Sequence, residues 1–252
     1  MHIFLVNDDG IGAPGIMALL HAAVSAGHEV TMCAPKYQQS AASHRFTIAD
    51  PIYAAPWPTE IPNCRAWAIT GSPADCVRIG VDELLEKPVD VLISGINKGY
   101  NAGVAVQYSG TVGAAMEGSF YRIPSIAASI HHKATQEMLD HFAAYVIRIA
   151  QQYASAQTPA STILNINAPL TAPKDIQGVV YAPLDTANFA DHYVRRESPR
   201  AGTYFWLDDT GEMEAFTPGC DNDWLEKGHI TLTLMGAPVS HDQSIWDALH
   251  IR

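Results

Sequence analysis

Apolar runs of strand length alternate with helical patterns through the first half of the chain, which is typical of βαβ units and a parallel sheet. Polar loops containing glycine follow these runs, where the strands of an open sheet would end. Beyond about residue 178 the pattern changes to short strand-like pieces between glycine, proline and charged turns. We therefore predict a doubly wound, Rossmann-like α/β fold with a mostly parallel sheet over residues 1–177 and a β-rich appendage over residues 178–252.

The first predicted strand covers residues 2–6, where apolar residues run without interruption. A helix should span residues 14–26, because apolar side chains recur there at helical spacing and Gly27 can end it. The second strand is expected at residues 29–34. Residues 48–62 contain four prolines, which exclude a central strand and predict an edge strand or a loop.

The second half of the sheet is predicted from similar signals. A short strand at residues 66–70 precedes a helix that begins after Ser72, a hydroxyl N-cap followed by proline, and runs to about Leu85. A buried strand at residues 89–93 should lead into a polar loop at residues 94–103. The remaining elements of this domain are a small-residue helix at 112–120, a strand at 125–130, a helix at 135–153 and a strand at 162–167.

The predicted appendage contains strand-like segments at residues 203–207 and 230–234. Unpaired strand edges favour pairing with a second chain. We therefore expect this arm and C-terminal segment to serve oligomerisation, through subunit pairing or arm exchange.

Composition excludes several classes of partner. A net charge of −11 and a sequence pI near 5.3 argue against a nucleic-acid polymer, whose phosphates demand a basic surface. No apolar stretch is long enough to span a membrane, and the four cysteines show no C-x-x-C spacing. The chain also begins in a strand rather than in a secretory signal. We expect a cytoplasmic protein without a membrane partner.

Two adjacent carboxylates, Asp8 and Asp9, stand where the first strand must end. Neighbouring carboxylates raise each other's pKa, and a hard cation with oxygen ligands keeps both ionised. One alternative is that an aspartate caps the following helix. Another is that Gly10, Gly12 and Gly15 form the G-x-G-x-x-G turn of a nicotinamide-dependent oxidoreductase, although no acidic residue ends the second strand to hold a ribose.

Other loops at the same sheet edge complete a candidate site. Ser40 offers a hydroxyl and Asn97 an amide carbonyl, so ligation would be by oxygen alone, which suits Mg²⁺, Mn²⁺ or Ca²⁺ better than zinc. The segment from Ser109 through Gly110 to Thr111 opens a helix and offers N–H groups to an anion, although it can also be a plain N-cap. A cation beside an anion cradle is the minimum apparatus for metal-assisted hydrolysis of a phosphate ester.

In these residues the chain resembles a known family, that of the stationary-phase survival protein SurE, whose members are metal-dependent 5'-nucleotidases. The resemblance rests on segments that keep the family's order and spacing over nearly the whole chain. These are residues 6–10, 13–15, 34–40, 71–77, 94–97, 101–103, 108–112, 164–169, 223–224 and 228–230.

The resemblance implies hydrolysis of nucleoside monophosphates to nucleoside and phosphate, with one divalent cation, Mg²⁺ or Mn²⁺. The implied cation ligands are Asp8, Asp9, Ser40 and Asn97, and the implied phosphate contacts are Asn101, Ser109, Gly110 and Thr111. Arm exchange between subunits is also implied. A non-catalytic nucleotide-binding module remains an alternative.

We expect the cation to orient a water for in-line attack, with Asp8 or Asp9 accepting its proton. A covalent aspartyl-phosphate is the competing mechanism, but the Asp-x-Asp pattern of haloacid-dehalogenase phosphatases is broken here by Gly10. The chain departs from the family at Ala41, where glycine is usual, and at Lys98 and residues 100–107. Substrate preference is therefore not fixed by the resemblance.

Overall fold

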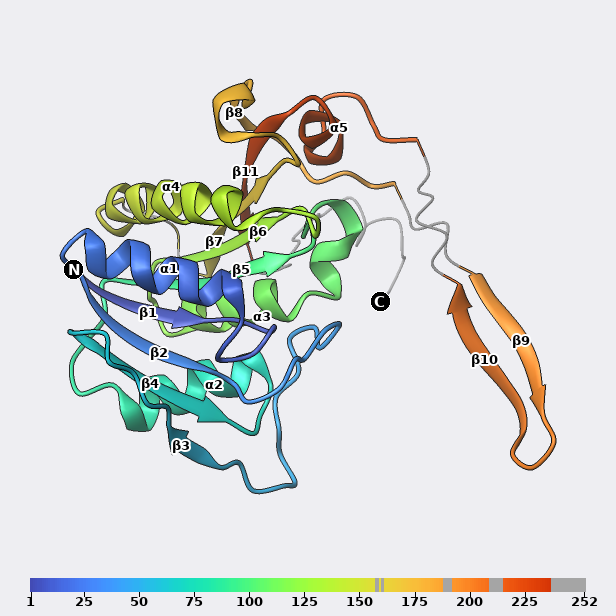
Figure 1. Cartoon of the computed structure of the whole chain (residues 1–252), viewed down its shortest axis with the longest axis horizontal. Coiled ribbons are helices and arrows are strands. Elements are labelled where there is room, and N and C mark those ends of the chain that lie inside the picture. The colour runs from blue at the N-terminus through green and yellow to red at the C-terminus, as the bar shows by residue number, and fades with distance from the viewer. Residues whose placement is uncertain (157–158, 160, 188–191, 209–214, 237–252) are drawn as a thin grey trace, which may run out of the picture.

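The computed structural model describes residues 1–156, 159, 161–187, 192–208 and 215–236, and it is built on a nine-stranded sheet (Figure 1). The strand order is β3-β4-β2-β1-β5-β6-β7-β11-β8. From β4 to β7 all neighbours are parallel, whereas β3 and β11 run antiparallel to β4 and β7. The predicted doubly wound, mostly parallel sheet is confirmed.

The strands of this sheet are β1 (His2–Val6), β2 (Glu29–Pro35), β3 (Ala54–Pro56), β4 (Cys64–Ile69), β5 (Val91–Lys98), β6 (Ser125–Ile130), β7 (Thr162–Ala168), β8 (Gly178–Tyr181) and β11 (His229–Gly236). The α-helices are α1 (Pro14–Ser25), α2 (Pro73–Ile79), α3 (Gly110–Phe120), α4 (Gln136–Ala154) and α5 (Asp221–Glu226). Short 3-10 or π turns cover Gly80–Leu84, Gly103–Gln107 and Pro173–Asp175.

Helices cover both faces of the sheet: α1 and α4 pack together on one face, and α2 and α3 on the other (Figure 1). All five residues of β1 are buried, as expected for a central parallel strand between two helical layers. In α4 the side chains of Leu139, Phe142 and Val146 recur at helical spacing and face the core. Helix α1 begins at Pro14 and is followed by Gly27, whose φ of +79° suits the residue after a helix.

Helix α3 is buried almost throughout, because its small residues let other segments approach closely. A Cβ added at Gly118 would lie 2.6 Å from Ser125 Oγ, so this glycine lets α3 lie against the sheet. A Cβ at Gly113 would lie 2.5 Å from the carbonyl oxygen of Ser43, so it lets the loop after β2 lie against α3. The helix therefore joins the sheet to that loop.

The prediction of a strand at 89–93 followed by a loop was wrong in its boundaries. Strand β5 begins at Val91 and continues through the polar residues to Lys98. Its pairing with β6 shifts register between Ser94 and Asn97, and Gly95 there has a φ of +139°. The shift is a β-bulge, which turns the strand without ending it. Glycine and polar residues indicated a turn, but Asn97 belongs to the strand.

The assignment of residues 230–234 to the appendage was also wrong, because they lie in β11 and pair with β7 in the main sheet. Ile230 and Leu232, two positions apart on β11, are both buried in the core. The side chains on that side of the strand therefore face the interior of the main domain. The separate small sheet is a ribbon of β9 (His192–Ser198) and β10 (Gly202–Asp208). Residues 237–252 of the predicted appendage lie outside the described residues.

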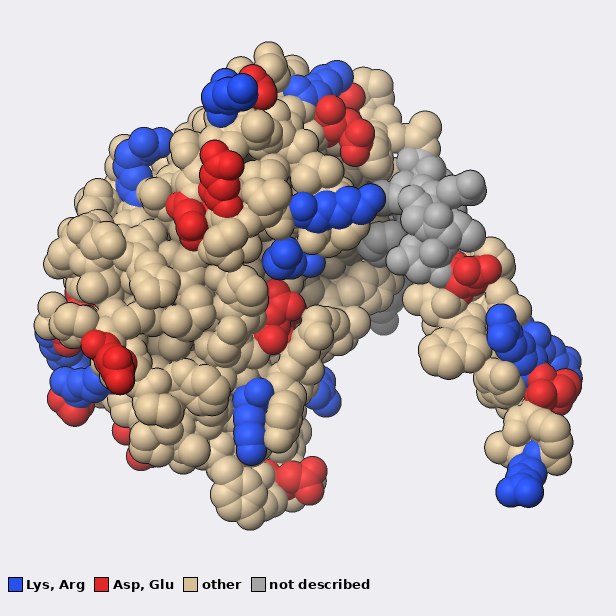
Figure 2. All heavy atoms as spheres, in the orientation of Figure 1, with Lys and Arg blue, Asp and Glu red and all other residues tan. Residues whose placement is uncertain are grey.

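The ribbon stands clear of the main sheet in Figure 1, and all of β10 is exposed. Arg and acidic side chains both lie on it (Figure 2): β9 and the following turn supply Arg195, Arg196, Glu197 and Arg200, and β10 ends at Asp208. In the described part of the chain no helix is long and apolar enough to cross a membrane.

Candidate active site

The strand order reverses between β1 and β5, because the chain builds outward from β1 through β2 to β4 and then returns to build β5, β6 and β7. Ligands of open α/β sheets bind beyond the carboxyl ends of the strands at such a switch point. Asp8 and Asp9 follow β1 directly, and Asn97 lies near the end of β5. The backbone N–H of Lys98 donates to Asp9 Oδ2 at 3.4 Å, which joins the two strand ends.

Asp8 is held against the beginning of α3. Its side chain accepts a hydrogen bond of 2.6 Å from Thr111 Oγ1, and the residue is 5% exposed. A Cβ at Gly110 would lie 3.0 Å from the Cβ of Asp8, so glycine lets the helix approach Asp8 more closely than a residue with a side chain would without a small shift. Burial, together with the charge of Asp9, raises the pKa of Asp8 to about 6 although the Thr111 hydrogen bond opposes the shift.

Asp9 is linked to Ser40 through Gln38, a residue that the sequence analysis did not single out. Gln38 Nε2 donates to Asp9 Oδ1 at 3.3 Å and to Ser40 Oγ at 2.9 Å. The backbone N–H of Gln39 donates to the carbonyl oxygen of Asp8 at 2.7 Å, which fixes the loop to the end of β1. Burial raises the pKa of Asp9, against hydrogen bonds from Lys98 and Gln38.

Asn97 is oriented by its own turn. Its Nδ2 donates to the carbonyl oxygen of Gly99 at 2.9 Å, so the amide oxygen is the group left to accept or ligate on the other side. This contact is the turn interaction that Asn-x-Gly favours. The hydrogen bond to Gly99 orients the Asn97 side chain and uses the amide nitrogen, so the amide oxygen can still bind a cation.

The donor set fits a hard cation. Two carboxylates whose pKa values are raised by burial favour a compensating positive charge, and a serine hydroxyl and an amide supply neutral oxygens beside them. No group of three or more His, Cys, Asp or Glu side chains in the described residues can hold a metal ion. A cation at this site therefore depends on the carboxylate pair and on neutral oxygens, which suits Mg²⁺ or Mn²⁺.

The helix-capping alternative for the aspartates is wrong. The N-cap of α1 is Ala13, and no side chain makes a capping hydrogen bond there. The carboxylates therefore face other partners. It is Asn7 that closes the turn, since it donates to the carbonyl oxygen of Gly10 at 2.8 Å and accepts from the Gly10 N–H at 3.2 Å.

The glycines that imitate a dinucleotide turn have a packing role. A Cβ at Gly15 would lie 1.9 Å from the carbonyl oxygen of Ile96, so this glycine lets α1 pack against β5 immediately before Asn97. Gly10 has a φ of +105°, which few other residues adopt. These two glycines therefore build the corner around Asp8 and Asp9, and the oxidoreductase alternative is not favoured.

The predicted phosphate contacts lie at two different places. Ser109 is the N-cap of α3, where its Oγ accepts from the Val112 N–H at 3.1 Å. Asn101 is buried behind the loop, and its Nδ2 donates to Ser129 Oγ at 2.8 Å while its N–H donates to Asn167. Gly110 and Thr111 thus lie directly beside Asp8, Ser109 precedes them as the N-cap, and Asn101 anchors the segment leading to α3.

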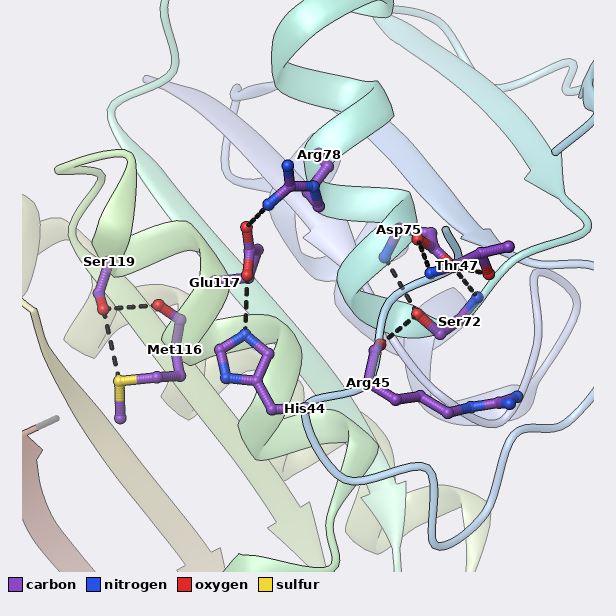
Figure 3. Close-up of polar contacts among 9 residues, drawn as sticks. All are labelled: His44, Arg45, Thr47, Ser72, Asp75, Arg78, Met116, Glu117 and Ser119. Carbon is purple, nitrogen blue, oxygen red and sulfur yellow. Dashed lines mark hydrogen bonds and ion pairs between the residues drawn. The ribbon is translucent and has the colours of Figure 1, made fainter. Parts of the chain in front are cut away.

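The loop that carries Ser40 is anchored by two buried carboxylates, shown in Figure 3. Glu117 of α3 accepts from His44 Nε2 at 2.8 Å and from Arg78 Nη1 at 3.0 Å. Asp75 of α2 accepts from the N–H of Thr47 at 2.9 Å and from its hydroxyl at 2.7 Å. Both helices therefore hold the far end of the loop.

These anchors have an electrostatic basis. Burial alone raises the pKa of Glu117, but the hydrogen bonds and positive charges of His44 and Arg78 hold it below its usual value. Glu117 lies seven residues after Gly110, so α3 presents both the anion cradle and the anchor of the Ser40 loop. Sequence reasoning did not find this pair, because His44 and Glu117 are 73 positions apart.

Replacing Ala41 with glycine is expected to stabilise the protein by about 0.5–1 kcal/mol. Ala41 has a φ of +55°, a left-handed conformation that strains a residue with a Cβ by about 1–2 kcal/mol. Glycine relieves this strain, but its greater conformational freedom in the unfolded chain offsets part of the gain in stability. Urea unfolding midpoints measure the effect. Ala42→Gly is the matched control, since Ala42 is buried and is not among the positive-φ residues, and it should destabilise. An unchanged midpoint for Ala41→Gly would contradict the strain.

The contribution of Asp8 to the stability of the metal-free protein is expected to fall as the pH rises from about 4 to about 7. The pKa of Asp8 is raised from 3.8 to about 6 on folding, so its contribution to the free energy of unfolding is fully present below pH 3.8 and lost as the pH rises through 6. The difference of about 2 pKa units corresponds to about 3 kcal/mol. Urea unfolding in EDTA, compared with Asp8→Asn, measures it. A stability difference between wild type and variant that does not change with pH would contradict this expectation.

A pocket of about 720 Å³ opens beside Asp9. Lys36 and Lys98 contribute to its wall, so two positively charged side chains line it in a chain of net charge −11. This local charge favours an anionic ligand.

Oxygen ligands next to a helix N-terminus are the apparatus of metal-assisted phosphate-ester hydrolysis, so fold and site together indicate the class of α/β phosphomonoester hydrolases. Comparison with known families agrees with this class. Residues 3–191 match the family described as "Survival protein SurE". The chain belongs to the SurE family.

Curated relatives and a solved structure extend the match to nearly the full length. The "5'-nucleotidase SurE" of Solidesulfovibrio magneticus is 39% identical over 233 residues, 92% of this chain and 90% of that protein. The "5'-nucleotidase SurE" of Thermosynechococcus vestitus is 39% identical over 98% of this chain and 95% of its own length. The crystal structure of the SurE protein from Aquifex aeolicus superposes with a TM-score of 0.81, at 29% identity, covering 99% of this chain and 98% of that one.

Proposed function

We propose that this protein is a 5'-nucleotidase that hydrolyses nucleoside monophosphates to nucleoside and phosphate with the help of one divalent cation, Mg²⁺ or Mn²⁺. The observation that carries the proposal is the contact between the carboxylate pair and the beginning of α3 at the sheet's switch point. A cation held by Asp8 would therefore lie next to the first turn of α3, whose N–H groups can bind an anion. The curated relatives named 5'-nucleotidase support the substrate class.

In this proposal Asp8, Asp9, Ser40 and Asn97 hold the cation. The bound cation would supply Lewis acidity toward a phosphate oxygen and lower the pKa of a water. Thr111 orients Asp8 through its 2.6 Å hydrogen bond. Asp9 lines the pocket and is less buried than Asp8, so it is the better placed of the two to accept a proton from the attacking water.

The phosphate would lie at the N-terminus of α3. N–H groups in the first turn of a helix bind anions, and the partial positive charge of the helix end adds to them. Ser109 offers its hydroxyl at the same place. Preorganised donors of this kind contribute about 3 kcal/mol each to transition-state stabilisation.

The test is a phosphate-release assay with AMP after EDTA treatment, repeated with Mg²⁺, Mn²⁺, Ca²⁺ and no added metal. Release that requires Mg²⁺ or Mn²⁺ supports the proposal. Binding of AMP without release under any of these conditions would instead favour the non-catalytic nucleotide-binding module. A trapped phosphoenzyme would replace the direct attack of water with a covalent aspartyl-phosphate.

A homodimer or homotetramer and a cytoplasmic location belong to the same proposal. The exposed ribbon of β9 and β10 carries Phe205, Trp206 and Tyr193, which favours burial against a second copy of the chain. The cysteines are free thiols, as expected in a reducing compartment. Sedimentation velocity measures the oligomeric state.

A further inference from the structure

The pocket that is lined by Asp9, one of the four proposed cation ligands, also contains a pair of aromatic side chains that the catalytic proposal does not use. Its wall includes Asp9 and Lys98 together with Tyr37 and Trp57. A volume of about 720 Å³ is within the usual range for a small-molecule site. The pocket therefore has room for more than a phosphate.

Trp57 is held in place by the edge of the sheet while its ring remains accessible. Its backbone N–H donates to the carbonyl oxygen of Ala66 at 2.7 Å, directly after β3. The side chain is 39% exposed, and its Cζ2 would lie 3.8 Å from a Cβ added at Gly12. A fixed backbone thus presents an indole over the turn that follows the two aspartates.

Tyr37 lies on the loop that carries Gln38 and Ser40, and it is 68% exposed. The ammonium of Lys36 lies 5.2 Å from the centre of its ring. Exposing two large aromatic rings has a hydrophobic cost, so their position at one pocket calls for a ligand with a flat apolar face.

A second groove makes the choice of pocket testable. It has a volume of about 610 Å³, is lined in part by Ser109, and includes Met116, Leu234 and Met235 in its wall. Its lining contains no Trp, Tyr, Phe, Lys or Arg side chain. The imidazole of His44 also lines this groove, but it already stacks on Phe120 and bonds to Glu117. Aliphatic and thioether groups can cover an apolar ligand but do not stack on it as aromatic rings do, so the pocket at Asp9 suits a purine or pyrimidine better.

We infer that the pocket at Asp9 is the nucleoside subsite, with Trp57 as the principal stacking surface for the base and Tyr37 as a second wall. This inference rests on the proposed nucleotidase function, because it names the part of the substrate recognised beyond the phosphate. Lys36 and Lys98 add positive charge to the wall of this pocket. Substrate preference then depends on the segment from β3 to β4 as well as on the catalytic loops.

The experiment compares AMP with glycerol 3-phosphate, a phosphomonoester without a base, in steady-state hydrolysis by wild type and Trp57→Ala. The loss of base stacking, about 1–3 kcal/mol, should lower kcat/KM for AMP by about 5- to 150-fold, chiefly through KM. Hydrolysis of glycerol 3-phosphate should not change. Trp57→Phe should recover most of the loss, and Tyr37→Ala should show a smaller one.

Leu234→Ala is the matched control, because it removes an exposed apolar side chain from the other groove. The inference is overturned if Trp57→Ala leaves AMP hydrolysis unchanged, if both substrates lose activity equally, or if Leu234→Ala alone raises KM for AMP. Titration calorimetry of AMP binding to the wild type and Trp57→Ala tests the subsite without catalysis. Weaker AMP binding by the variant together with no hydrolysis by the wild type would overturn the proposed function and leave the subsite intact.

Discussion

Replacing Asp9 with asparagine is expected to lower kcat/KM for AMP by about 10³-fold without unfolding the protein. The change removes a negative ligand from the cation site and the group best placed to accept a proton, and losing one such electrostatic contribution typically costs 10²–10³-fold, roughly. The fold should persist, because asparagine keeps the shape of the side chain and its one oxygen can still accept one of the two long hydrogen bonds that Gln38 and Lys98 donate to the two oxygens of Asp9. Removing one member of a carboxylate pair also relieves repulsion of Asp8.

The measurement pairs phosphate release with the binding of Mn²⁺ followed by electron paramagnetic resonance. Asp140→Asn is the control, since Asp140 is an exposed aspartate on α4, where it accepts from Gln136. Its activity and Mn²⁺ affinity should match the wild type. If Asp9→Asn kept more than about a tenth of the wild-type activity, the carboxylate would have no central part in the reaction.

The position of the carboxylate pair was predictable because the cause is local. A continuous apolar run before Asp8 indicates a strand buried on both faces, and in a wound sheet the residues after such a strand lie at the ligand edge. Ser40 was placed by the same logic after the second strand. The structure brings both to one corner, where Gln38 joins Asp9 to Ser40.

Other features depend on contacts between distant segments, and no local sequence pattern predicts them. A glycine among polar residues, as at the bulge in β5, is typical of a turn. Only the pairing of β6 with the residues on both sides of it shows that the strand continues. Likewise, Ile230 alternates with polar neighbours whether it belongs to an arm or to the main sheet, and only its pairing partner decides. The anchor between His44 and Glu117 is of the same kind. Periodicity finds strands but not their neighbours.

The glycines at positions 10, 12 and 15 are compatible with a dinucleotide-binding turn and with a corner built around the two aspartates, and the contacts of each glycine decide between these interpretations. In a dinucleotide fingerprint the second glycine lets the backbone approach a pyrophosphate. Here a Cβ at Gly12 would meet only the Trp57 ring, at 3.8 Å, whereas a Cβ at Gly15 would meet the backbone of Ile96. Packing thus depends on Gly15, and nothing in the described contacts of the protein chain requires Gly12.

Gly15→Ala is therefore expected to destabilise the protein by about 3 kcal/mol or more and to weaken Mn²⁺ binding, while Gly12→Ala should change stability by less than about 1 kcal/mol. The new methyl group at position 15 would lie 1.9 Å from the carbonyl oxygen of Ile96. A backbone atom cannot rotate away as a side chain can, so α1 must separate from β5 beside Asn97. Urea unfolding and Mn²⁺ titration of the two variants measure both effects. Equal midpoints would show that α1 tolerates the displacement, and loss of metal binding in Gly12→Ala alone would contradict the packing role assigned to Gly15.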